Sequence, residues 1–103
     1  MRTIEFDIGI APSHPALPGH FPGNPVVPGV LLLDRLLAGL QAETGMRAQR
    51  LDQARFHSAL RAGEEARAYC SIDGPRVDFR LQARRRGVAT LLASGRLTLG
   101  AAP

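Results

Sequence analysis

Lysine is absent from this sequence: all 13 cationic residues are arginines, and against 9 acidic residues they give a formal net charge of +4. With the wealth of alanine, glycine, leucine and proline, the absence of lysine is typical of a GC-rich genome, so much of the arginine content reflects codon usage. A mildly basic surface still favours acidic partners over basic ones. We do not expect nucleic acid as a partner.

Cysteine and long apolar runs are also scarce. The single cysteine, Cys70, excludes an intramolecular disulfide, and its strand-like surroundings predict a small packing residue. No apolar run approaches the ~20 residues that a membrane-spanning helix needs, and no apolar segment of a signal peptide follows the N-terminal residues. We therefore expect a cytoplasmic protein without a membrane span.

The length of 103 residues fits one domain, over residues 1–103. A monomer of this size buries only about 60–70% of the surface that its unfolded chain exposes. A homodimer or a higher oligomer, which adds buried area, is therefore favoured.

The N-terminal part predicts one strand and then a stiff loop. Apolar residues alternate over residues 3–10, which is typical of a half-buried strand; they are Ile4, Phe6, Ile8 and Ile10. Proline recurs through residues 11–29, and we expect no regular helix or sheet there, because proline lacks the amide donor. These prolines are Pro12, Pro15, Pro18, Pro22, Pro25 and Pro28.

Residues 30–41 predict a helix, which Pro28 and Gly29 would open and Gly45 would end. Leucines fall on nearly every side of it, so we expect a buried helix rather than an amphipathic surface helix.

Strand patterns follow over residues 50–57, 66–73 and 77–81, and over a long last segment. In that last segment we expect one face to carry Leu91, Ala93, Leu97 and Leu99. Residues 59–64 predict a connecting turn, and Arg86–Gly87 predicts a hairpin turn. One strand, one helix and an antiparallel run of about four strands predict an α+β fold, in which a curved sheet of about five strands wraps round one long buried helix.

Three features of the sequence point to chemistry. His20 stands in the proline-rich loop, where a histidine can act as a base near neutral pH. Asp34 stands among leucines; if it is buried, the protonated carboxyl is favoured and can donate a proton, and if it lies on a wet stripe beside Arg35 it has no such role. The amide at Gly29, at the start of the helix, could stabilise a developing negative charge on a thioester oxygen.

The segment Gly19–Leu31, with the sequence GHFPGNPVVPGVL, resembles the signature of the 3-hydroxyacyl-[acyl carrier protein] dehydratases, which have the hot-dog fold. In that family an acidic residue follows the histidine by fourteen positions, where this chain has Asp34. The family has Glu in one branch and Asp in the branch that also isomerises the double bond. The short N-terminus looks more like the small dehydratases of aryl polyene pathways. Family members often have Gln four residues after the acid, where this chain has Ala38.

The resemblance implies a dimer with shared active sites, each using His20 of one subunit and Asp34 of the other. His20 would remove the C2 proton of a 3-hydroxyacyl thioester, the Gly29 amide would polarise the carbonyl, and Asp34 would protonate the departing hydroxyl. No metal or organic cofactor is needed, and the partner would be an acyl carrier protein. The expected substrate-binding residues around these groups are Phe21, Pro28, Val30 and Leu33.

Two rival functions stay open at this point. A hot-dog thioesterase would release free acid and thiol, although such thioesterases generally lack the Gly-His-Phe-Pro-Gly motif. A non-catalytic acyl-binding subunit of a heteromeric dehydratase would show no turnover alone. The arginine cluster at residues 84–86 could dock an acidic carrier protein or could be a solvated turn. We expect His14 and His57 to be surface or packing residues.

Overall fold

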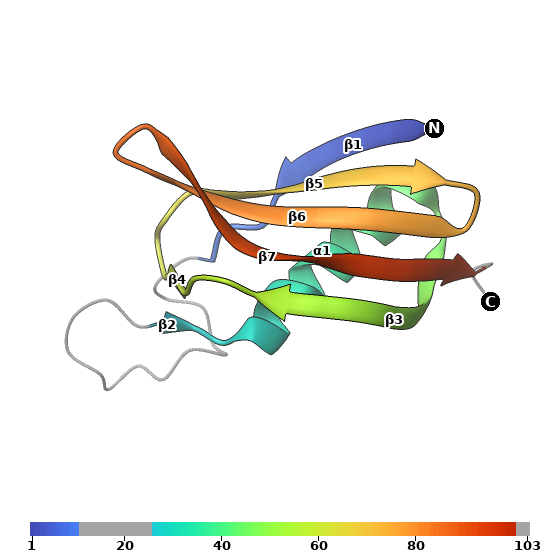
Figure 1. Cartoon of the computed structure of the whole chain (residues 1–103), viewed down its shortest axis with the longest axis horizontal. Helices are drawn as coiled ribbons and strands as arrows, with labels where there is room; N and C mark the ends of the chain where they lie inside the picture. Colours follow the sequence, from blue (N-terminus) through green and yellow to red (C-terminus); the bar gives the residue numbers. More distant parts are fainter. Residues whose placement is uncertain (11–25, 101–103) are drawn as a thin grey trace.

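The computed structural model describes residues 1–10 and 26–100. In these ranges the chain forms one helix, α1 (Gly29–Thr44), and a set of strands (Figure 1). The strands are β1 (Arg2–Asp7), β2 (Val26–Val27), β3 (Arg47–Phe56), β4 (Leu60–Arg61), β5 (Ala66–Asp73), β6 (Arg76–Arg85) and β7 (Val88–Gly100).

Five of the strands form one antiparallel sheet in the order β1-β5-β6-β7-β3, and α1 lies against one face of it (Figure 1). The helix follows β1 and leads into β3, so the chain crosses from one edge of the sheet to the other along that face. β2 and β4 pair separately, Val26 with Arg61 and Val27 with Leu60. The expected α+β class, with one helix and an antiparallel sheet, is confirmed.

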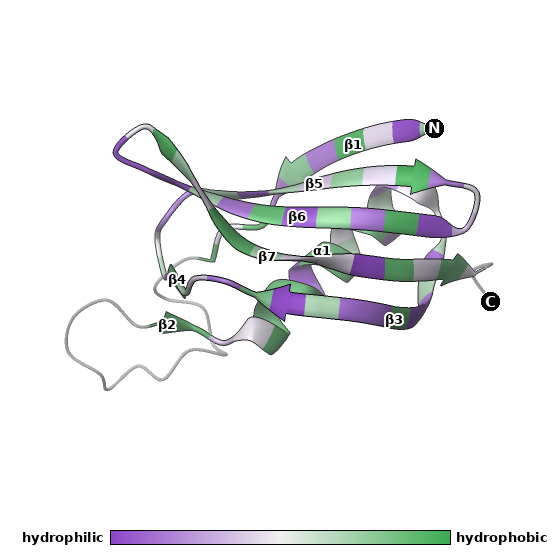
Figure 2. Cartoon of the chain, in the orientation of Figure 1, coloured by the Kyte–Doolittle hydropathy of each residue, from purple (hydrophilic) through white to green (hydrophobic). Residues whose placement is uncertain are grey.

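The core lies between the sheet and the helix because the central strands alternate in polarity. Val77, Phe79 and Leu81 of β6 are all buried, as the sequence predicts, and polar residues separate them (Figure 2). Cys70 on β5 is buried beside them, and this burial raises the pKa of its thiol to about 12. Cys70 is therefore a packing residue, as expected.

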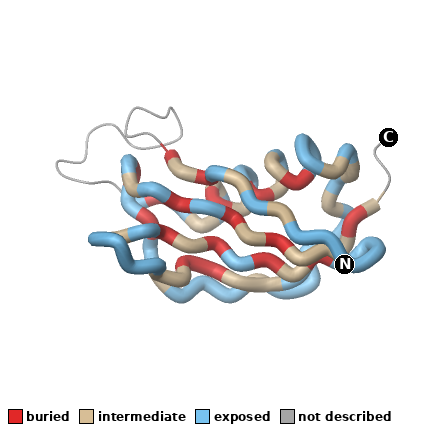
Figure 3. The backbone as a smooth tube through the Cα atoms, turned by 90° about the horizontal axis from the view of Figure 1, so that it is seen from above, coloured by how far each residue is buried: buried red, intermediate tan, exposed pale blue. Residues whose placement is uncertain are grey.

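Helix α1 buries a single stripe against the sheet, made of Leu32, Leu36 and Leu40 (Figure 3). On the opposite side of the helix, Val30 is 68% exposed and Asp34 is exposed. The single chain thus does not bury the helix on nearly every side, contrary to the expectation from its leucines. The helix ends as expected, with Gly45 in the left-handed conformation and its N–H donating to the Gln41 carbonyl over 2.8 Å.

Two boundaries in the N-terminal half differ from prediction. β1 ends at Asp7 rather than at residue 10, because the Asp7 carboxylate accepts the Gly9 N–H at 3.0 Å and turns the chain. The prediction that residues 11–29 form no sheet was wrong at β2. Val26 and Val27 stand between Pro25 and Pro28, but as valines they retain the backbone N–H groups that a strand needs, and they pair with β4. The predicted turn at residues 59–64 likewise contains β4, which pairs with β2.

In β7, a bulge at Leu92 changes the predicted alternation. Leu81 pairs with Ala93 and Gln82 pairs with Leu91, so Leu92 is an extra residue on β7. Leu92 and Ala93 are both buried, and Leu91 is only partly buried. The expected inward face of Ala93, Leu97 and Leu99 is right, but Leu92 takes the core position expected for Leu91. The hairpin turn at Arg86–Gly87 is confirmed, with positive φ at both residues.

Within residues 1–10 and 26–100, no helix is long and apolar enough to cross a membrane.

Candidate functional site

The N-terminal end of α1 carries the partial positive charge of the helix dipole. Pro28 is its N-cap residue, and the Pro28 carbonyl accepts the N–H groups of Leu31 and Leu32 at 3.0 and 3.3 Å. Within the described part of the chain, no side chain caps this end and no acidic residue stands in the first turn. The dipole of the sixteen-residue helix therefore acts on whatever lies beside Gly29.

An aromatic ring lies directly over this helix start. A Cβ built on Gly29 would lie only 2.8 Å from Cε1 of Phe56 and 2.9 Å from its Cζ. Phe56 is the last residue of β3, and its side chain faces the helix although it is 52% exposed. With glycine at position 29 the helix backbone lies close to this ring, and a larger residue there would displace the ring.

The helix start and the ring border one apolar hollow. Its lining comes from the β2–α1 junction, the end of β3 and the segment that leads into β4. The lining residues are Val26, Val27, Pro28, Gly29, Leu32, Phe56, His57, Ser58, Ala59 and Leu60. Two of the expected site residues, Pro28 and Gly29, therefore belong to one hollow.

Hydrogen bonds fix the segment after β3 that forms one wall of this hollow. The carbonyl of Leu92, at the β7 bulge, accepts the N–H groups of His57 at 2.7 Å and Ser58 at 3.2 Å. The guanidinium of Arg85 also donates to the Ala59 carbonyl. The bulge at Leu92 thus has a structural role, since it holds the wall opposite Gly29.

Arg85 and Glu64 form a two-point ion pair behind this wall. Nε of Arg85 donates to Oε2 of Glu64 at 2.7 Å, and Nη2 donates to Oε1 at 3.0 Å. The same carboxylate accepts the Arg61 N–H at 2.7 Å. The hydrogen bond from Arg85 lowers the pKa of the Glu64 carboxyl, and Glu64 in turn raises the pKa of Arg85. Sequence reasoning gave no signal for this pair, whose members stand 21 positions apart.

The arginine cluster at residues 84–86 is therefore not a uniform charged surface. Arg85 is paired with Glu64, and both side chains line a separate hollow together with Ala59, Arg61, Arg84 and Arg86. Ala59 belongs both to this basic hollow and to the apolar one at Gly29. The two hollows thus adjoin each other.

The other expected site residues lie elsewhere. Asp34 is exposed on the side of α1 that faces away from the sheet, with Val30 and Ala38 one turn before and after it. Leu33 is half-buried and packs against the core. None of Val30, Leu33 and Asp34 lines the hollow at Gly29. His20 and Phe21, with His14, lie outside the described residues.

His57 is exposed, as expected of a surface residue, and its Nε2 lies 3.1 Å from Oγ of Ser94. In the described ranges, no group of three or more His, Cys, Asp or Glu side chains could hold a metal ion.

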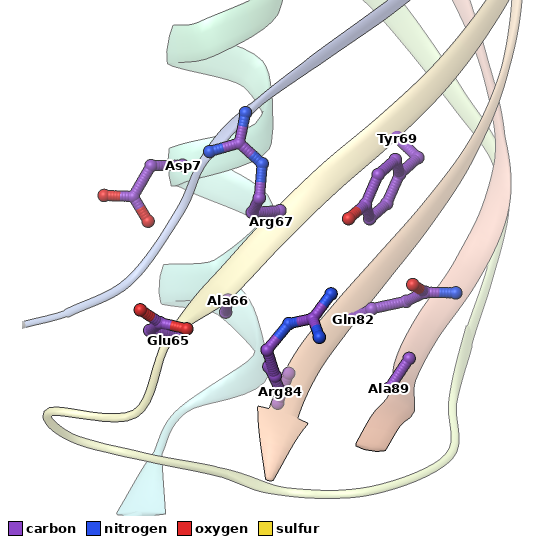
Figure 4. Close-up of a pocket in the computed structure, with 9 residues that line it drawn as sticks. Asp7, Glu65, Ala66, Arg67, Tyr69, Gln82, Arg84 and Ala89 are labelled. Carbon is purple, nitrogen blue, oxygen red and sulfur yellow. The ribbon is translucent and has the colours of Figure 1, made fainter. Parts of the chain in front are cut away.

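A further hollow lies on the sheet face that points away from α1 (Figure 4). Side chains of both charges surround it; they include Asp7, Glu65, Arg67, Gln82 and Arg84. Apart from Arg84 of the arginine cluster, it contains none of the expected residues, and it is typical of a solvated polar sheet face.

Comparison with known proteins supplies the family context. A family model described as "ApeI-like: ApeI dehydratase" matches residues 1–96. Relatives named 3-hydroxyacyl-[acyl-carrier-protein] dehydratase FabZ are 32% identical in Chloroflexus aggregans and 31% identical in Caldanaerobacter subterraneus subsp. tengcongensis. These matches cover 84% and 85% of this chain, and 66% and 72% of those relatives.

Two solved structures share the fold. An uncharacterised protein from Erwinia carotovora subsp. atroseptica superposes with a TM-score of 0.78 at 18% identity, covering 96% of this chain and 82% of that one. The dehydratase heterocomplex ApeI:P from Xenorhabdus doucetiae gives a TM-score of 0.71 at 21% identity, covering 94% and 84%.

Proposed function

Because the chain belongs to the ApeI-like dehydratase family, we propose that it removes water from 3-hydroxyacyl groups carried on an acyl carrier protein. The product is a trans-2-enoyl thioester, and the setting is fatty-acid or polyene-lipid synthesis in the cytoplasm. The relatives named as 3-hydroxyacyl-[acyl-carrier-protein] dehydratases support this substrate class.

The observation that carries the proposal is the uncapped start of α1, which opens at Gly29 on an apolar hollow. A thioester carbonyl placed beside the Gly29 amide gains stabilisation as negative charge develops on its oxygen. The mostly apolar lining offers few groups that compete for this hydrogen bond. Pro28, which also lines the hollow, contacts the acyl group.

In the proposed mechanism His20 is the base and takes the proton from C2. The electrons of the broken C2–H bond form the C2=C3 double bond, and the C3–O bond breaks. Asp34 delivers a proton to the departing hydroxyl, directly or through a water, and water leaves. Phe21, Val30 and Leu33 complete the acyl site. No metal or organic cofactor takes part.

We assign Asp34 to the active site of a second subunit, because it points away from the hollow of its own chain. Large apolar side chains are also exposed on β2, on α1 and on β3. They are Val26, Val30, Leu51 and Phe56. β3 is also an edge strand, which a second copy could extend. Such a dimer covers the outer stripe of α1 and so completes the buried helix of a hot-dog fold. The ApeI:P heterocomplex makes a heteromer the alternative assembly.

Mass spectrometry of a 3-hydroxyacyl carrier protein incubated with the purified chain tests the activity. We expect the carrier-bound acyl group to lose one water. His20→Ala should lower the rate roughly 10²- to 10⁴-fold, and Asp34→Asn should also lower it strongly. Asp73→Asn, at the β5–β6 turn far from the hollow, is the matched control and should keep the rate.

Release of free acid and thiol would replace this proposal with a thioesterase. Turnover that appears only after a partner chain is added would make this chain the non-catalytic subunit of a heteromer.

A further inference from the structure

The outer face of the sheet, which points away from α1, brings two arginines to either side of one serine (Figure 1). Ser94 of β7 lies directly opposite Arg55 of β3 and, on its other side, directly opposite Arg80 of β6. Side chains in such a row have Cβ atoms about 4.5–5.5 Å apart. Because the adjacent residues Phe79 and Ala93 are buried under the sheet, this row points outward. Two positive charges therefore flank one hydroxyl.

A shallow hollow opens beside Ser94 on this face. Its polar side chains are those of Gln53, Arg55, His57, Asp78, Ser94 and Arg96. Its volume of about 290 Å³ lies at the lower limit of ligand sites, roughly 300–1,000 Å³, so it suits a small ion or one group of a larger ligand. It shares only His57 with the hollow at Gly29 and is otherwise separate from the proposed dehydratase site.

The positive charge beside this hollow is not fully compensated. Of its lining residues only Asp78 is acidic, and that carboxylate already accepts the Nε–H groups of Arg96 and Arg76, both at 3.1 Å. Arg55 and Arg80 take part in none of the ion pairs found in the two ranges that the structure describes. The hollow in Figure 4 differs, because acidic side chains there offset the arginines.

His57 can direct the hydroxyl of Ser94 toward a ligand. Nε2 of His57 lies 3.1 Å from Oγ of Ser94. When Nε2 carries the proton it donates to Oγ, and the Ser94 O–H is then available to a second acceptor. An oxyanion above Ser94 can accept this O–H together with the guanidinium N–H groups of Arg55 on the neighbouring strand. Arginine forms paired, charge-assisted hydrogen bonds of this kind with phosphate oxygens.

We propose that Arg55, Ser94 and His57 form a binding site for a phosphate group on the outer face of the sheet, with Arg80 and Arg96 adding positive charge around it. The ligand is free phosphate or the terminal phosphate of an ester. A tetrahedral anion suits the site because its oxygens can face donors on β3 and β7 at the same time. The dimer proposed above covers α1 and the edge of β3, so this face stays open to solvent.

Phosphate titration of the full chain, followed by NMR, tests the site. Inorganic phosphate replaces chloride at constant ionic strength, so that general screening of the arginines does not change. We expect saturable shifts of the amides of residues 53–57 and 94–96 and of Nε of Arg55, with a Kd in the millimolar range. Glycerol 3-phosphate in a parallel titration distinguishes the two sources. An equal Kd identifies the phosphate group alone as the ligand, and a lower Kd for the ester identifies a larger ligand.

Two variants and a matched control assign the binding to named groups. Arg55→Gln should raise the Kd for phosphate about fivefold or more, because it removes a charged donor. Ser94→Ala removes only a neutral donor and should raise the Kd about threefold. Arg47→Gln removes the same charge from the same strand but lies outside the hollow, so it should leave the Kd unchanged.

Shifts that grow linearly with phosphate and never saturate would overturn the proposal. Equal losses of affinity in Arg47→Gln and Arg55→Gln would also overturn it, since they would show only a general attraction to a basic chain. Saturable shifts confined to residues 84–86 would place the phosphate in the basic hollow instead. Dehydration is measured separately with the carrier-protein substrate, so failure of this site would leave the proposed function standing.

Discussion

Glycines at two positions show how closely the elements of this chain approach each other. Gly29 lies under the ring of Phe56, and Gly95, in the middle of β7, lies under the backbone of β3. A Cβ on Gly95 would lie 2.0 Å from the Gln53 carbonyl oxygen and 2.7 Å from Cζ of Phe79. Since the first of these atoms belongs to the backbone, no side-chain rotation can make room for it.

Gly95→Ala should therefore lower the free energy of unfolding by about 2 kcal/mol or more, because β3 must move away from β7. Urea denaturation measures the change. Gly100→Ala, on the same strand, is the control: its Cβ would meet only the side chain of Gln49, at 3.1 Å or more. This variant should change stability by less than about 0.5 kcal/mol. Equal effects from the two variants would contradict the close approach at Gly95.

Single residues differ in how far the sequence reveals their role. The sequence alone marks Asp34 and Gly29 as candidates, through a contiguous motif and through the chemistry of a helix start. Phe56 was visible only as a large apolar strand residue, since nothing local indicates that its ring meets Gly29. That contact depends on where β3 ends relative to α1.

At the scale of elements, the Arg85–Glu64 pair joins the end of β6 to the segment around β4. The pair is partly shielded, with side-chain exposures of 33% and 23%. Because the folded-state pKa of Glu64 is lowered below its usual value of 4.5, the ionised carboxylate stabilises the fold. This contribution is fully present above pH 4.5 and is lost as the pH falls through the lowered value.

Glu64→Gln should therefore destabilise the protein by about 1 kcal/mol at neutral pH, and the difference from the wild type should shrink in acid. Urea midpoints at pH 7 and at the lowest pH where both proteins fold provide the test. Glu65→Gln, the neighbouring acid, forms none of the ion pairs found among the described residues and should show no such trend. A Glu64→Gln difference that grows on acidification would reverse the assigned sign.

Elements with a regular hydrophobic period agreed best with prediction. β5 runs from Ala66 to Asp73 as expected, and α1 ends before Gly45 as expected. β7 departed from prediction at Leu92 because an inserted residue reverses the alternation, and a bulge is defined by the partner strand rather than by its own sequence. β2 and β4 were missed for a similar reason, since two-residue strands have no period to detect.

For the whole molecule, the proposed assembly leads to a test of shared sites. If His20 of one subunit works with Asp34 of the other, then His20→Ala and Asp34→Asn chains can complement each other. In a mixed dimer one site has lost both groups and the other retains both. After subunits exchange in an equal mixture, activity should recover to about a quarter of the wild-type level.

Native mass spectrometry of differently tagged chains verifies the exchange, and the dehydration assay measures the recovery. Mixed dimers that form without regaining activity would place His20 and Asp34 in the same subunit. They would also remove the reason for assigning the outer face of α1 to a partner.

The sequence by itself determined the helix, the main strands, the α+β class and the resemblance carried by residues 19–34, because these follow from local periodicity, turn chemistry and a contiguous motif. Tertiary structure alone decided that Phe56 covers Gly29, that Leu92 replaces Leu91 in the core and that Arg85 forms an ion pair with Glu64. Each of these depends on strand register and on the path of the chain between distant segments, which no local pattern of residues encodes.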